Sequence, residues 1–312
     1  MTNNNQTKRI GDWQQLLMGI GFWILLSALL AQLALVFSEN VLGVSLASLS
    51  NQNKLKEEEW WTLVLSGLFI PSLSFVLAPF GLSKIFRRSW LDELTLNRAP
   101  IKKQLLLSLL LFVFSSGAVG FLLQINQGLT LPEELSKVVQ SLEAQSNRVY
   151  QMVLQKNQGF GTLLVIVFMA FFPALTEEVF FRGFAMKKLI GIGGNFHLGI
   201  WLSAAFFAII HVQPLKFLPM LLLGAILGYV AYYSRSIWAS VSIHFMNNTL
   251  AVLQNYFNKK EVLNIPDIEE SVHINPLLAA VSFLAIFGIL FLMNKAEKEI
   301  IYPENIHDYQ SD

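Results

Sequence analysis

The chain has 312 residues, of which 54% are hydrophobic and 14% are charged, and its formal net charge is +1. Soluble domains carry about 25% charged residues, so this composition indicates a membrane protein. The near-zero net charge argues against a nucleic-acid partner. The absence of cysteine excludes both disulfides and thiolate metal sites.

Apolar runs of membrane-spanning length recur along the chain. We predict an all-α, polytopic membrane protein with about eight transmembrane helices around a polar intramembrane site. Their approximate positions are Leu16–Phe37, Thr62–Leu82, Gln104–Gln124, Phe160 onward through the acidic pair at 177 and 178, His197–Val212, Phe217–Tyr233, Ile237–Phe257 and Pro276–Met293.

The loop between the second and third predicted spans orients the protein. It carries six basic residues: Lys84, Arg87, Arg88, Arg98, Lys102 and Lys103. Short loops rich in lysine and arginine stay in the cytoplasm, so this loop and the N-terminus are expected on the cytoplasmic side.

A long polar segment, residues 125–159, precedes the fourth span. Pro132 followed by Glu133 and Glu134 is typical of a helix start. Apolar residues then recur at helical spacing as far as Leu142, which predicts an amphipathic external helix.

The fourth span carries charge where a membrane helix rarely does. Glu177, Glu178 and Arg182 follow the uncharged run Phe160–Ala174, and Pro173 loosens the helix just before them. On the insertion scale a charge near a helix centre costs about 2.5–3.5 kcal/mol. Glu178 and Arg182 can pair at i,i+4, whereas Glu177 points away from them and needs a partner on another helix.

Two later spans supply polar partners. His211 ends one apolar run, with Phe207 one turn before it, and His244 lies in another with Asn248 one turn after it. Counting 1.5 Å per residue from the connecting turns brings these groups and the acidic pair to one depth. The spacing therefore predicts one site built from three helices.

Simpler readings exist for each residue taken alone. The acidic pair could sit in a cytoplasmic helix end beside Lys187 and Lys188. A lone intramembrane histidine commonly packs as a hydrogen-bonded core residue, and Asn247 with Asn248 could join helices. The remaining histidines lie at a span edge, in a loop and in the tail: His197, His273 and His307.

Glutamate beside histidine can deprotonate and orient a water for attack on a carbonyl, and a second histidine with an asparagine can stabilise the oxyanion. The same set, Glu177, His211 and His244, could instead hold a divalent metal such as zinc with an open water position. The cofactor is thus a divalent ion or none, and both versions predict amide hydrolysis in or at the membrane. There is no His-Glu-x-x-His motif, and every aspartate lies outside the predicted spans.

Three ordered motifs, Glu177-Glu178-x-x-x-Arg182, Phe207-x-x-x-His211 and His244-x-x-x-Asn248, resemble those of the CPBP family. That family groups type II CAAX prenyl endopeptidases with bacterial Abi proteins. The resemblance implies an intramembrane endopeptidase in which Glu177 activates water with the help of His211. It places His244 and Asn248 at the oxyanion and gives Glu178 and Arg182 a structural or substrate-orienting role.

From this we expect residues 1–159 to hold three spans and the external loop, 160–257 the catalytic core, and 258–312 the last span and a charged tail. The expected partners are the lipid bilayer and a membrane-associated or lipid-modified peptide or protein substrate. The expected location is a bacterial cytoplasmic membrane. A non-proteolytic immunity or scaffold protein of the same fold is the main alternative. A transporter with a proton or metal relay would need a polar path that the first three spans do not offer.

Overall fold

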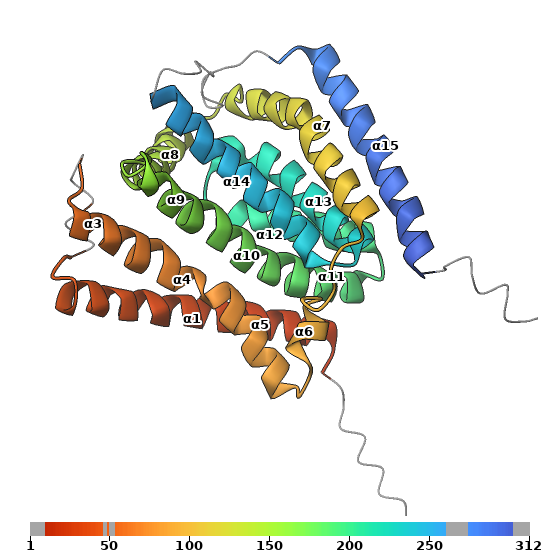
Figure 1. Ribbon diagram of the computed structural model, residues 1–312, viewed down its shortest axis with the longest axis horizontal. Helices are drawn as coiled ribbons and strands as arrows, with labels where there is room; N and C mark the ends of the chain where they lie inside the picture. Colours follow the sequence, from red (N-terminus) through yellow and green to blue (C-terminus); the bar gives the residue numbers. More distant parts are fainter. Residues whose placement is uncertain (1–9, 46–48, 50–53, 260–273, 302–312) are drawn as a thin grey trace, which may run out of the picture.

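The computed structural model describes residues 10–45, 49, 54–259 and 274–301, and this part of the chain is helical without strands (Figure 1). His273, His307 and the basic residues of the N-terminal tail lie outside the described residues. The elements are α1 (Asp12–Asn40), α3 (Glu57–Thr62), η1 (Leu63–Phe69), α4 (Ile70–Ser72), α5 (Ser74–Ile85), α6 (Trp90–Glu93), α7 (Lys102–Gln127), α8 (Glu133–Leu154), α9 (Phe160–Ile166), η2 (Val167–Phe171), α10 (Phe172–Glu178), η3 (Val179–Ala185), α11 (Met186–Gly193), α12 (Phe196–Ile210), η4 (Pro214–Lys216), α13 (Phe217–Ser234), α14 (Ile237–Lys259) and α15 (Pro276–Ile301).

Each of the eight predicted spans corresponds to a helical segment. In the described part of the chain, six helical runs are long and apolar enough to cross a membrane: Asp12–Asn40, Glu57–Ile85, Lys102–Gln127, Phe160–Gly193, Pro214–Ser234 and Pro276–Lys298. The other two differ, because α12 is only 15 residues long and α14 carries the polar residues of the third motif. The protein is therefore an integral, all-α polytopic membrane protein.

The fifth predicted span ends earlier than the sequence suggested. The helix expected to run to Val212 stops at Ile210, and His211 caps it with φ −72° and ψ −16°. Pro214 follows three residues later, and a proline pushes the residue before it out of the helical region. At 1.5 Å per residue α12 is about 22 Å long, short of a hydrocarbon core of about 30 Å.

Wide π-helical turns interrupt two of the spans. In the fourth span η2 lies just before Pro173, and η3 begins immediately after Glu178. Proline lacks an N–H and its ring clashes with the carbonyl one turn earlier, so the preceding turn must widen. Such π segments frequently occur at functional sites, and here two of them flank the acidic pair.

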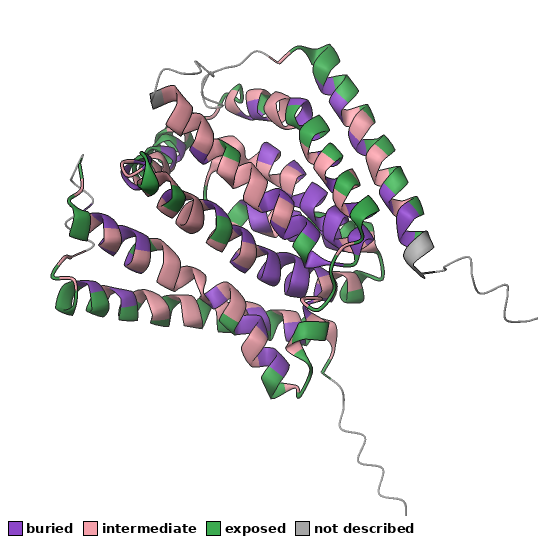
Figure 2. Ribbon diagram, viewed as in Figure 1, coloured by how far each residue is buried: buried purple, intermediate pink, exposed green. Residues whose placement is uncertain are grey.

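The helices form a bundle in which α1 and α3–α5 lie along one side and α7 and α15 along another, with α9–α14 between them (Figure 1). The largest buried apolar cluster centres on α13. Burial is greatest on the central helices, whereas α1 and α15 expose much of their surface (Figure 2). Exposed leucines such as Leu25 and Leu284 on these outer helices suit contact with lipid.

A polar cluster ties the predicted cytoplasmic loop to the bundle. Glu93, at the end of α6, accepts hydrogen bonds from Ser83 at 2.9 Å, Arg88 at 3.0 Å and Lys188 at 3.1 Å. Burial acts to raise the pKa of the Glu93 carboxyl, but these donors outweigh it and leave that pKa below its ordinary value. The ionised carboxylate therefore joins α5, α6 and α11.

Candidate functional site

Glu178 and Arg182 form the ion pair that their spacing predicted. The Arg182 Nη1 atom lies 2.7 Å from Glu178 Oε1, and both side chains are almost wholly buried. The other end of the guanidinium donates to the carbonyl oxygen of Gly224 on α13 at 3.0 Å. Its central carbon lies 4.9 Å from the ring centroid of Phe207. Arg182 therefore fastens the helix of the acidic pair to α12 and α13.

His244 reaches the same pair from α14. Its Nδ1 atom lies 3.0 Å from Glu178 Oε1, and its side chain is 5% exposed. A carboxylate only accepts hydrogen bonds, so Nδ1 carries the proton and donates it. This leaves Nε2 of His244 directed toward Glu177, whose Oε2 atom is 3.8 Å away.

His211 approaches Glu177 from another direction. Its Nδ1 atom lies 2.7 Å from the backbone carbonyl oxygen of Phe207, so Nδ1 is again the donor. Its ring lies against that of Phe207, with the centroids 4.4 Å apart. The Nε2 atom of His211 is then 3.9 Å from Glu177 Oε2.

Glu177 Oε2 is the atom on which the site converges. It is buried, has no hydrogen-bond partner, and faces the Nε2 atoms of both His211 and His244. Distances of 3.8 and 3.9 Å are too long for direct hydrogen bonds. Leaving a buried carboxylate oxygen unpaired is costly, so this oxygen calls for an explanation, of which a catalytic role is one.

Asn248 lies one turn beyond His244 on α14. Its amide oxygen accepts a hydrogen bond of 3.3 Å from Asn247. Its role at the oxyanion stays a prediction, because this contact does not connect it to Glu177. His197 is remote from the acidic pair at the start of α12, where its Nδ1 atom lies 2.7 Å from the hydroxyl of Tyr229.

The three candidate metal ligands lie slightly further apart than a tetrahedral zinc site requires. Zinc holds nitrogen and oxygen ligands at about 2.0–2.2 Å, which places neighbouring ligand atoms about 3.3–3.6 Å apart. The distances from Glu177 to the two histidines are longer. Among the residues that the structure describes, no group of three His, Cys, Asp or Glu side chains could hold a metal ion.

Sequence reasoning missed the carbonyl of Gly224, the second partner of Arg182. A side chain at Gly224 would meet Ala204 of α12 at 3.1 Å, so the glycine allows α12 and α13 to approach closely. Glycines at 224 and 228 match the small-xxx-small spacing of close membrane-helix contacts, which was the available signal. Also missed were Asn126 and Glu143, which contact the turn after His211.

Fold and site together define a polytopic helical membrane protein with a buried carboxylate–imidazole centre. Residues 159–250 match the family model described as type II CAAX prenyl endopeptidase Rce1-like. This segment contains all three motifs, and the match confirms the resemblance to the CPBP family there. It leaves α1–α8 and α15 outside, and its description names neither Abi proteins nor a metalloprotease. Comparison with curated proteins and with solved structures found no match.

Proposed function

We propose that this protein is an intramembrane endopeptidase in which Glu177 activates the attacking water. The observation that carries the proposal is the convergence of two Nε2 atoms on the unpartnered Oε2 of Glu177. Each ring is held by its own Nδ1 hydrogen bond, one to Phe207 and one to Glu178. The family match over the same segment supports this class of reaction.

In this scheme one water bridges Glu177 Oε2 and His211 Nε2. With hydrogen bonds of about 2.8 Å, one oxygen can reach two atoms that are 3.8–3.9 Å apart. Glu177 takes a proton from this water as its oxygen attacks the carbonyl carbon of the scissile amide, and His211 orients the water through Nε2. The proton then passes from Glu177 to the leaving amine as the carbon–nitrogen bond breaks.

His244 stabilises the oxyanion in this scheme. Glu177 and Glu178 bring two negative charges into the buried site and Arg182 brings one positive charge. The scheme requires His244 in its doubly protonated form, with Nδ1–H donating to Glu178. Its Nε2–H is then free to donate to the tetrahedral oxyanion, with the Asn248 amide as the second donor.

The proposed substrate is a membrane-associated or lipid-modified peptide, cleaved in a bacterial cytoplasmic membrane. We assign catalysis to residues 160–257, with residues 1–159 and 258–312 flanking this core. The family match to residues 159–250 supports that division.

The test uses the purified full-length protein in detergent with two internally quenched peptides of one sequence. One peptide carries a farnesylated cysteine before its last three residues, and the other carries no lipid. Wild-type protein should cleave at least one of them and Glu177→Gln should cleave neither, whereas the exposed control Glu134→Gln should match wild type. Mass spectrometry of membrane peptides from cells with wild-type or Glu177→Gln protein extends the test to native substrates. If wild type and Glu177→Gln give the same products in both assays, the protein has a non-proteolytic role.

A further inference from the structure

The turn that follows His211 adopts a conformation that its own sequence does not favour. Val212 has a φ of +51°, in the left-handed region, which β-branched residues rarely adopt. The chain then passes through η4 and enters α13 at Phe217. A strained backbone of this kind persists only when surrounding contacts hold it.

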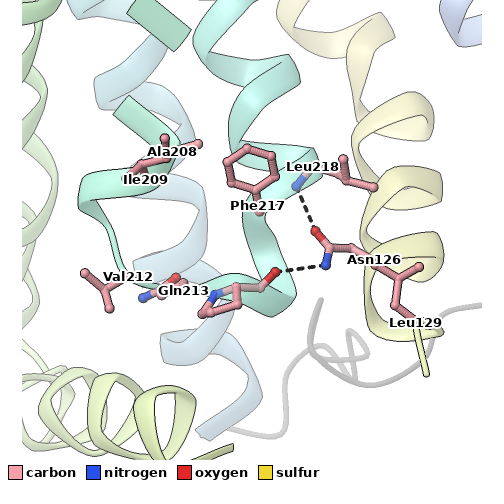
Figure 3. Close-up of a pocket in the computed structure, with 9 residues that line it drawn as sticks. Asn126, Leu129, Ala208, Ile209, Val212, Gln213, Phe217 and Leu218 are labelled. Carbon is pink, nitrogen blue, oxygen red and sulfur yellow. Dashed lines mark hydrogen bonds between the residues drawn. The ribbon is translucent and has the colours of Figure 1, made fainter. Parts of the chain in front are cut away.

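An open cavity of about 500 Å³ lies beside this turn, so protein packing covers only part of it (Figure 3). The walls of the cavity include Ala208 and Ile209 before the turn, Val212 and Pro214 within it, and Phe217 after it. Ile209 and Val212 are more than half exposed there, so they make fewer protein contacts than buried core residues. Hydrogen bonds to the backbone of the turn therefore add to the contacts that position it.

Asn126 provides two such contacts from α7. Its amide Nδ2 donates to the carbonyl oxygen of Pro214 at 2.9 Å, and its Oδ1 accepts from the backbone N–H of Leu218 at 2.7 Å (Figure 3). The side chain is only 4% exposed. The Leu218 N–H belongs to the first turn of α13, which has no partner within its own helix. One buried amide thus joins the start of η4 to the start of α13.

Glu143 provides a third contact from the amphipathic helix α8. It is 7% exposed, and its Oε1 atom accepts from the backbone N–H of Leu215 at 3.0 Å. Ser146, one turn further along α8, accepts a hydrogen bond from the side chain of Gln213. Two helices outside the family-matched segment, α7 and α8, therefore hydrogen-bond to the turn that begins at His211.

We propose that Asn126 and Glu143 are positioning residues that hold the Val212–Lys216 turn and thereby fix the His211 imidazole against Glu177. The inference rests on the proposed function for its catalytic consequence. Asn126 and Glu143 act through His211, since neither residue touches the reacting atoms. A misplacement of about 1 Å can cost about 10²-fold in rate. Removing the hydrogen bonds of Asn126 or of Glu143 should therefore lower kcat about 10- to 100-fold.

The experiment compares Asn126→Leu, Glu143→Ala and Glu143→Gln in the full-length protein. Asn126→Leu removes both amide contacts at similar size, whereas Glu143→Gln keeps an oxygen acceptor for Leu215. The matched control is Asn157→Leu, because Asn157 is also fully buried and donates to a backbone carbonyl, that of Val252. The readouts are the imidazole ¹⁵N resonances, assigned with His211→Gln, and kcat and KM on the cleaved peptide.

Asn126→Leu and Glu143→Ala should each shift the His211 resonances and lower kcat with KM within about twofold of wild type. Glu143→Gln should restore both readouts. Unchanged His211 resonances in both folded variants would overturn the proposal, as would an equal His211 shift in Asn157→Leu. If Asn126→Leu fails to fold, the Glu143 pair decides the outcome. The resonances also separate the two hypotheses, because they report the position of His211 even if wild type and Glu177→Gln prove equally inactive.

Discussion

The Glu178–Arg182 pair allows the energetics of the site to be tested without knowing the substrate. Arg182→Gln removes the buried partner of Glu178, the donor to the Gly224 carbonyl and the cation over Phe207. Breaking a fully buried pair by removing one partner typically costs about 3–5 kcal/mol, because an uncompensated charge remains. His244 stays within 3.0 Å of Glu178, so we expect the lower half of that range.

The assay is a double-mutant cycle with Glu178→Gln, Arg182→Gln and the double variant, unfolded in mixed micelles and followed by tryptophan fluorescence. Removing both charges leaves no unpaired ion, so the double variant should be at least about 2 kcal/mol more stable than the sum of the single losses predicts. Additivity within about 0.5 kcal/mol, or a wild-type unfolding curve for Arg182→Gln, would refute the reasoning.

Three further outcomes are expected. The hydrogen-bond donors of Glu93 lower its pKa despite its burial, so its contribution to stability should be complete above its unfolded pKa of about 4.5 and lost as pH falls through the folded pKa. The free energy of unfolding should therefore fall less between pH 7 and pH 3 in Glu93→Gln than in wild type, and an equal fall in both would contradict this. Cleavage should persist in a strong chelator if Glu177 acts without a metal, whereas loss with recovery on added zinc would favour an ion at that residue. Single cysteines at the exposed positions Ser89 and Ser141 should react with an impermeant thiol reagent from opposite sides of the membrane, and labelling of both from outside would reverse the topology.

The parts of the site that could be predicted are those that depend on local spacing or on depth. The pairing of Glu178 with Arg182 follows from i,i+4 geometry within one helix, and the structure has it at 2.7 Å. The convergence of His211 and His244 on Glu177 followed from counting helical rise from the connecting turns. Both arguments use helix geometry, and the backbone groups of an apolar span must be satisfied internally even where π-helical turns interrupt it.

The contacts that could not be predicted join residues far apart in the chain. Arg182 bonds to Gly224 and Asn126 to Pro214, pairs separated by 42 and 88 residues. Such contacts depend on how neighbouring helices rotate and shift against each other, which periodicity within one helix does not determine. The helix α12 also ends before the predicted Val212, which adopts a left-handed conformation that its residue type does not indicate.

The site consists of two halves, which are held by different kinds of contact. The Glu178–Arg182–His244 group is buried and joined by contacts of 2.7 and 3.0 Å, and it forms one half of the site beside Glu177. The His211 half stands on a strained turn beside a cavity and is held by α7 and α8. Substitutions of Asn126 or Glu143 should therefore lower turnover through His211 while leaving the contacts among Glu178, Arg182 and His244 in place.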